Sequence, residues 1–169
     1  SDGIVSGGTT ADSNATKFPA FTGKDLDGND VSSDKLFSGN AFTVVNFWFT
    51  TCKPCVGELG DLDALHKDVA GKGGAVVGIN AFTLGGDAAA IADAKDVLTK
   101  SGATYQNVYF DADSEAGKFT ENVYAYPTTY VVDRNGNIVG DPIVGAITSD
   151  GHMETLQALI DTALANDKG

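Results

Sequence analysis

The chain has 169 residues, with 23 acidic and 11 basic side chains, so its formal net charge is 11 − 23 = −12 with both histidines neutral. This length corresponds to one ordinary domain, and 42% hydrophobic with 20% charged residues is a globular composition, which excludes a disordered chain. A surface this acidic repels phosphate backbones and anionic lipids, which argues against nucleic acid and anionic membranes as partners.

The N-terminal segment 1–17 is rich in Gly, Ser, Thr, Asp and Ala and shows no hydrophobic period. This composition predicts a flexible spacer ahead of one folded domain over 18–169, although a frayed terminus would have the same composition. The chain begins at Ser1 and its one methionine is Met153. We therefore expect that the native start has been removed, and with it a signal peptide or a lipid anchor.

The first half of the domain predicts a hairpin, a buried strand and a helix. Segments 21–26 and 29–32 flank Asp27-Gly28, which is a hairpin signal. The run 41–49 is almost continuously apolar, as expected for a central strand buried on both faces. After Pro54, apolar residues recur at spacings of three or four and predict one amphipathic helix ending at Gly71, with the stripe Val56, Leu59, Leu62, Leu65 and Val69.

The second half of the domain alternates between the apolar patterns of strands and those of helices. The predicted strands are 74–81, 106–110, 128–133 and 137–141, and the predicted helices are 87–100, 114–122 and one that follows Ser149. The last two strands flank Arg134-Asn135-Gly136, where Asn-Gly is a strong hairpin signal. Because parallel strands need helical crossovers, this order predicts an α/β fold in which helices cover both faces of a mixed sheet. The site is expected at the carboxyl ends of the strands.

Both cysteines lie in the motif Cys52-Lys53-Pro54-Cys55, at the predicted junction of strand and helix. The N–H groups and dipole of a helix start stabilise a thiolate, and Lys53 adds a positive charge. Pro54 is tolerated in the first helical turn because its missing N–H has no partner to lose. We expect Cys52 to be the exposed nucleophile and Cys55, one helical step further in, to resolve the intermediate.

Three other interpretations of the motif are open. A zinc site needs four ligands, and the remaining soft candidates, His66 and His152, are far apart in the sequence. A structural disulfide would close so short a loop that it would stabilise the fold little. A peroxidatic cysteine of the peroxiredoxin type would be preceded by Pro and Thr, where this chain has Val45 and Phe49, and would have a partner arginine, whereas Arg134 lies in the predicted turn.

The order of motifs resembles the thioredoxin superfamily. Asn46-Phe47-Trp48 leads into the cysteine motif, and Tyr126-Pro127-Thr128 stands ahead of the predicted hairpin. The chain is most similar to the TlpA/ResA-like extracytoplasmic thiol-disulfide oxidoreductases. It shares with them an N-terminal hairpin, an inserted strand and helix over 74–100, and Glu58 three residues after the second cysteine. The resemblance covers about 18–165 and implies a thioredoxin-like fold.

The resemblance also implies a substrate site. Pro127 would be cis, and Tyr126 would expose backbone groups that pair with an extended substrate. The residues expected to contact substrate are Trp48, Lys53, Pro54, Tyr126 and Pro127. Two of these have simpler interpretations, because Pro127 could be an ordinary first strand residue and Trp48 a core aromatic.

Glu58 is the most informative charge in the sequence. Three residues beyond Cys55, it returns to the same helix face, where its carboxylate could serve proton transfer at the buried thiol. Many thioredoxins have a buried Asp on the central strand for this purpose, and the corresponding residue here is Asn46, which cannot titrate. The alternative is an acid that only stabilises the helix dipole.

The resulting hypothesis is an extracytoplasmic thiol-disulfide oxidoreductase, secreted or tethered as a bacterial lipoprotein, that reduces protein disulfides. It needs no cofactor and no metal. A membrane electron donor would restore the dithiol, apocytochrome c is one substrate that the resemblance suggests, and the protein is expected to be a monomer. Two alternatives are a copper-binding chaperone on a related fold, and a binding module whose disulfide is not catalytic.

Overall fold

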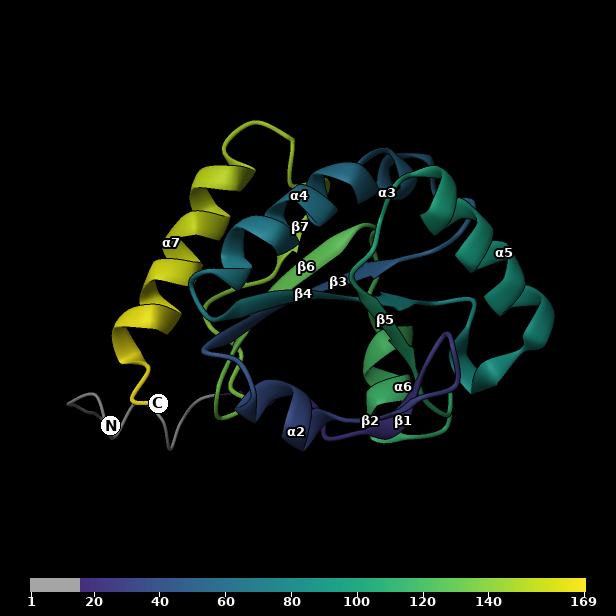
Figure 1. The fold of residues 1–169 in the computed structure, drawn as a ribbon, viewed down its shortest axis with the longest axis horizontal. Coiled ribbons are helices and arrows are strands. Elements are labelled where there is room, and N and C mark those ends of the chain that lie inside the picture. Colours follow the sequence, from purple (N-terminus) through teal and green to yellow (C-terminus); the bar gives the residue numbers. More distant parts are fainter. Residues whose placement is uncertain (1–15) are drawn as a thin grey trace.

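The structure, a computed structural model, describes residues 16–169. Seven strands form one sheet in the order β2-β1-β5-β4-β3-β6-β7 (Figure 1). The central pairs β3·β4 and β4·β5 are parallel, and the other pairs are antiparallel. The mixed sheet predicted from the sequence is confirmed, and the strands are β1 Thr22–Asp25, β2 Asp30–Ser32, β3 Phe42–Trp48, β4 Gly74–Asn80, β5 Gln106–Tyr109, β6 Thr128–Asp133 and β7 Ile143–Val144.

Helices cover both faces of the sheet, as Figure 1 shows, with α4 and α7 on one side and α2 and α6 on the other. None of the helices in 16–169 is long and apolar enough to cross a membrane. The helices are α2 Ser33–Ser38, α3 Lys53–Gly57, α4 Leu59–Ala70, α5 Ala88–Lys100, α6 Glu115–Glu121 and α7 His152–Asn166, with a short 3-10 turn η1 at Leu84–Gly86.

Two hydrophobic cores lie on the two faces of β3, and every residue of this strand is buried. Because side chains alternate along a strand, Val44 and Trp48 pack with α4, α5 and α7, whereas Val45 and Phe47 pack with α2 and α6. A strand packed on both faces has no freedom to shift its register. The end of β3 therefore provides a rigid base for the cysteine motif that follows it.

The predicted helix over 54–71 is divided in the structure. Glu58 has φ −103° and ψ −1°, and it separates α3 from α4. Gly57 before it has low helix propensity, and the carboxylate of Glu58 is bonded to groups outside the helix. The prediction of one continuous helix was wrong because these tertiary bonds override the helical period.

The predicted strand over 137–141 is also absent. An isolated bridge pairs Val132 with Ile138, and the chain then turns at Gly140, whose φ is +66°. Pro142 follows. The strand that pairs with β6 on the side away from β3 is instead β7, which pairs with Thr128 and Thr129. Helix α2 was not predicted, because its six residues are too few to show a helical period.

The start of the domain lies slightly before Phe18. Lys17 forms an antiparallel bridge with Asn137, and the carbonyl of Thr16 accepts a hydrogen bond from the N–H of Ile138 at 2.8 Å. The folded part therefore includes the last two residues of the expected spacer over 1–17. The rest of that spacer, 1–15, lies outside the described residues.

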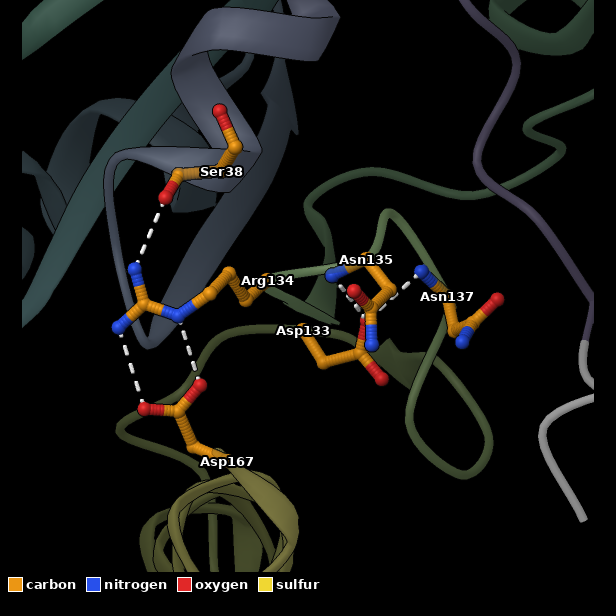
Figure 2. Close-up of polar contacts among 6 residues, drawn as sticks. All are labelled: Ser38, Asp133, Arg134, Asn135, Asn137 and Asp167. Carbon is orange, nitrogen blue, oxygen red and sulfur yellow. Dashed lines mark hydrogen bonds and ion pairs between the residues drawn. The ribbon is translucent and has the colours of Figure 1, made fainter. Parts of the chain in front are cut away.

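The predicted Asn-Gly turn after β6 is present, and Arg134 within it connects three segments. Figure 2 shows its guanidinium donating to both carboxylate oxygens of Asp167, at 2.7 and 3.1 Å, and to the carbonyl of Ser38 at 2.8 Å. The turn itself is held by the Asp133 carboxylate, which accepts from two backbone N–H groups (Figure 2). Asp133 pairs with Phe42 at the start of β3, so Arg134 lies at the opposite end of the sheet from the cysteines.

Candidate active site

The two cysteines lie where the sequence places them, at the start of α3, and they form a disulfide with a Cα–Cα distance of 5.2 Å. Cys52 is the N-cap residue, and its Sγ accepts a hydrogen bond from the N–H of Cys55 at 3.3 Å. Cys52 keeps 5% of its surface exposed, whereas Cys55 has none. Of the two cysteines, Cys52 is therefore the one that reaches the surface.

The surroundings of Cys52 favour its thiolate. The N–H of Cys55 is directed at its sulfur, no acidic residue occurs in the first turn of α3, and Lys53 follows directly. Lys53 and Pro54, the two residues between the cysteines, are both exposed. A negative sulfur at a helix start is stabilised by such donors, which lowers the pKa of a thiol placed there.

The loop before β6 lies next to the cysteine motif. The Tyr126–Pro127 bond is cis, as the resemblance implied. Thr128 pairs with Phe47 near the end of β3, so Pro127 approaches the segment that leads to Cys52. The carbonyl of Pro127 accepts from the N–H of Gly145 at 2.8 Å, which ties this loop to the one after β7.

A row of aromatic rings borders this loop, and two of its members were not identified from the sequence. The ring of Phe49 lies 5.3 Å from that of Tyr126, edge to face, and 5.1 Å from that of Phe82. Phe82 is 49% exposed, which is unusual for a large apolar side chain. Phe49 immediately follows the central strand, but Phe82 has no sequence signal because it lies in the loop after β4.

Asn80 holds both sides of this aromatic row in place. Its Oδ1 accepts from the N–H of Phe82 at 2.7 Å, and its Nδ2 donates to Oγ1 of Thr50 at 2.9 Å. Asn80 is fully buried at the end of β4. The loop that carries Phe82 and the loop that leads to Cys52 are therefore fixed by one amide.

Trp48 lies in the core and not on the surface. Its side chain has no exposed area, and its Nε1 donates to Oδ1 of Asn107 at 2.8 Å. Gly78 makes room for this pair, because a Cβ at that position would clash with the same oxygen. The expected direct contact of Trp48 with substrate is therefore corrected to the alternative interpretation, a core aromatic under the cysteine motif.

The Glu58 carboxylate points inward from the junction of α3 and α4. It is almost fully buried, and it accepts hydrogen bonds from Nδ2 of Asn46 at 3.1 Å and from the N–H of Ile147 at 2.7 Å. Burial raises the pKa of Glu58 above its ordinary value, and the nearby Asp61 adds to this effect. The two hydrogen bonds and the nearby His152 oppose the shift. Glu58 is thus a buried carboxyl with a raised pKa, next to the cysteine helix.

Asn46 orients Glu58 from the central strand. Its Nδ2 donates to Glu58 and also to Oγ1 of Thr129 on the neighbouring strand at 3.0 Å. Its Oδ1 is buried and has no hydrogen-bond partner among the described residues. Thr129 and Ile147 were not identified as site residues from the sequence, since no local motif marks a partner more than 80 residues away.

The chain is similar to known proteins over most of its length. The AhpC/TSA family matches residues 15–140. The thioredoxin-like protein YneN of Bacillus subtilis is 33% identical over 132 residues, which is 77% of this chain and 71% of YneN. The thiol-disulfide oxidoreductase ResA of Bacillus anthracis is 25% identical over 135 residues, covering 78% of this chain and 70% of ResA.

Solved structures show the same fold. A thiol:disulfide interchange protein of the thioredoxin family from Chlorobium tepidum has a TM-score of 0.65 and 26% identity, covering 89% of this chain and 97% of the other. A DsbF homologue from Corynebacterium diphtheriae has a TM-score of 0.65 and 25% identity, covering 89% and 88%. The chain therefore belongs to the AhpC/TSA family and is a thiol-disulfide oxidoreductase of the thioredoxin superfamily, similar to ResA.

Proposed function

We propose that this protein reduces disulfide bonds of other proteins outside the cytoplasm, with Cys52 as the nucleophile and Cys55 as the resolving thiol. The observation that carries the proposal is the asymmetry of the pair. Cys52 caps α3 and is the cysteine with exposed surface, whereas Cys55 is fully buried behind it. An exposed thiolate attacks a partner, and a buried neighbour within disulfide reach displaces the product.

The reaction transfers two electrons to the substrate. The Cys52 thiolate attacks one sulfur of a substrate disulfide and releases the other as a thiolate, forming a mixed disulfide. Cys55 then attacks Sγ of Cys52, which breaks the mixed disulfide, releases the reduced substrate and closes the Cys52–Cys55 bond. Cys55 must lose its proton for this step. Glu58 is the buried carboxyl near α3 and is the proposed acceptor of that proton.

The substrate surface is proposed to run from Cys52 across the aromatic row. Among residues 16–169, no hydrogen bond engages the backbone of Tyr126, which leaves its N–H and carbonyl available to an extended chain. Phe49 and Phe82 offer apolar contact next to it. Lys53 and Pro54 follow Cys52 in the chain and are exposed, and the buried Pro127 fixes the loop that carries Tyr126.

The finer assignments rest on similarity to ResA and to disulfide interchange proteins. They are an extracytoplasmic location, tethering through segment 1–17, re-reduction by a membrane electron donor, action as a monomer and, among substrates, apocytochrome c. The exchange chemistry itself calls for no cofactor, because both electrons are carried by the two sulfurs.

The direction is proposed to be reductive. Lys53 and the start of α3 favour the thiolate, which makes a dithiol more oxidising, but the net charge of −12 opposes a further negative charge. No histidine lies between the cysteines to stabilise the thiolate further. Equilibration with glutathione or dithiothreitol buffers should give a potential below roughly −180 mV, the level of protein disulfide isomerase. A higher value would make the protein an oxidase or isomerase.

Reduction of insulin in the presence of dithiothreitol tests the proposed activity. The wild-type protein should accelerate precipitation of the insulin B chain, and the double variant Cys52→Ser/Cys55→Ser should match the uncatalysed rate. Equal rates for the two proteins would refute the proposal. In that case a copper titration would examine the copper-chaperone alternative.

The peroxidatic interpretation finds no support in the geometry. Val45 and Phe49 occupy the positions where a peroxiredoxin has Pro and Thr; Val45 is buried in the core and Phe49 contacts Tyr126. Arg134 is paired with Asp167 at the far end of the sheet (Figure 2). Because Arg134 is the only arginine in the sequence, no arginine lies beside Cys52 to activate a peroxide.

A further inference from the structure

A single peptide group connects a histidine to the buried carboxylate. The loop between β7 and α7 carries the Ala146–Ile147 peptide. Its carbonyl, from Ala146, lies 2.7 Å from Nδ1 of His152. Its N–H, from Ile147, donates to Oε2 of Glu58, also at 2.7 Å. Both ends of this peptide are therefore bonded to titratable side chains, and it forms a bridge between α7 and the junction of α3 and α4.

The direction of the first bond follows from its partners. A carbonyl oxygen can only accept, so Nδ1 of His152 carries the proton and donates it. The imidazole lies close to this loop, since a Cβ at Gly145 would come within 3.3 Å of its Cε1, and Gly145, with φ +102°, leaves that space free. The N–H of His152 also donates to the carbonyl of Ser149 at 3.0 Å, which fixes the start of α7. The ring is thus bonded to Ala146 and lies next to Gly145.

We propose that His152 is a positioning residue, which orients the Ala146–Ile147 peptide so that its N–H holds the Glu58 carboxylate in place. Hydrogen bonds in a chain polarise one another, so a donor at the Ala146 carbonyl strengthens the Ile147 N–H as a donor to Glu58. The value of this arrangement for catalysis rests on the proposed function, in which Glu58 accepts the proton of Cys55.

The charged and titratable groups around Glu58 are few. Asp61 approaches from α4 and raises the pKa of Glu58, whereas His152 approaches from α7 and lowers it. Tyr105 lies just before β5. Burial raises the pKa of its hydroxyl, and the nearby charge of Glu58 adds to this effect. Of the groups that counteract the burial of Glu58, His152 alone acts both through the peptide and as a nearby ring. Its removal should therefore raise the pKa of Glu58 further.

Two substitutions separate the hydrogen bond from the bulk of the ring. His152→Ala removes the donor, whereas His152→Asn keeps an amide N–H at nearly the position of Nδ1. The readout is the Glu58 side-chain carboxyl signal, followed by NMR against pH in the oxidised protein without substrate. His152→Ala should move the midpoint upward, and His152→Asn should return it toward the wild-type value. Met153→Ala, at an exposed neighbour in the first turn of α7, is the matched control and should leave the midpoint unchanged.

The outcomes are decisive. A midpoint that is unchanged in His152→Ala, or raised equally in His152→Asn, would overturn the proposal. Thermal unfolding of each variant identifies any loss of fold. This measurement needs no turnover, so it can succeed even when the insulin assay shows that the proposed function is wrong.

The exchange rate provides a second readout. In the wild-type background, His152→Ala should slow disulfide reduction by a smaller factor than Glu58→Gln does. In the Glu58→Gln background, His152→Ala should have no further effect, because the group that it positions is already gone. Additive losses in the double variant would show that His152 acts independently of Glu58 and would refute the positioning role.

Discussion

Replacing Glu58 by Gln should remove the buried proton acceptor and leave the fold almost unchanged. The glutamine Oε1 can keep the hydrogen bond from Ile147, but its amide would face Nδ2 of Asn46, which is also a donor. Rotation of the Asn46 amide resolves this conflict. Its Oδ1, unpaired at present, would then accept from the new glutamine amide and from the hydroxyl of Thr129. The number of hydrogen bonds is preserved, and the buried unpaired atom of Asn46 changes from Oδ1 to Nδ2.

The expected cost in stability follows from this count. Hydrogen bonds to charged groups contribute about 1.5 to 3 kcal/mol, and neutral ones about 0.5 to 1.5 kcal/mol. The weaker hydrogen bonds of the neutral amide are offset because the cost of desolvating a buried carboxylate is also removed. We therefore expect a net change of about 1 kcal/mol or less in the free energy of unfolding near pH 7.

The pH dependence of stability has a definite sign. The folded-state pKa of Glu58 is raised, so its contribution to stability is fully present below the unfolded pKa and is lost as the pH rises through the folded value. Gln does not titrate. The variant should therefore gain stability relative to the wild type as the pH rises above about 4.5, the ordinary value. Urea unfolding at several pH values measures this difference.

The effect on catalysis should be much larger. General acid and base groups contribute about 10²- to 10⁴-fold, so Glu58→Gln should slow reduction of a protein disulfide by roughly 10²-fold at neutral pH. The difference in rate between the wild type and the variant should narrow toward pH ~8.5, where a free thiol ionises without a base. Stopped-flow kinetics measure this, with Asp68→Asn, at an exposed carboxyl further along α4, as the matched control. Equal rates for wild type and Glu58→Gln across this pH range would refute the proton-transfer role.

Two further predictions concern stability. Asp63 is buried, accepts from the N–H and hydroxyl of Thr104, and has its pKa lowered to about 2. Its contribution to stability is therefore present above pH ~4 and lost toward pH 2. Asp63→Asn should lower the free energy of unfolding in urea by about 2 kcal/mol at pH 7 and by less near pH 2. A cost that is independent of pH would contradict this. Arg134→Gln breaks the bonds to Asp167 (Figure 2), so it should lower the unfolding midpoint, more at low salt than at high salt. It should leave insulin reduction unchanged, and a slower reaction would mean that the far end of the sheet is coupled to the cysteines.

The parts of the fold that could be predicted from sequence are those with a local cause. The apolar run at 41–49 forms β3, and Cys52 caps the helix that follows, because burial on both faces and the helix start are properties of neighbouring residues. The cis bond before Pro127 was expected only from the order of motifs, which the resemblance supplied. These features define the cysteine site and its nearest loop.

The parts that could not be predicted have distant causes. The break at Glu58 depends on Asn46 and Ile147, which lie 12 and 89 residues away in the sequence. The link from His152 to Glu58 also joins distant parts of the sequence. No local pattern therefore distinguishes His152 from an ordinary surface histidine. Phe82 is exposed in a loop, and no periodicity marks its contact with Phe49.

The most direct test of the central claim is to trap the mixed disulfide. Cys55→Ser and Cys52→Ser, each reduced, are mixed with a protein that carries an accessible disulfide, and the adducts are mapped by mass spectrometry under non-reducing conditions. Because Cys52 keeps exposed surface and Cys55 keeps none, the Cys55→Ser variant should accumulate substrate on Cys52, and the Cys52→Ser variant should accumulate none. Capture by Cys55 in the Cys52→Ser variant, or no adduct on Cys52 at all, would contradict the assignment of Cys52 as the nucleophile.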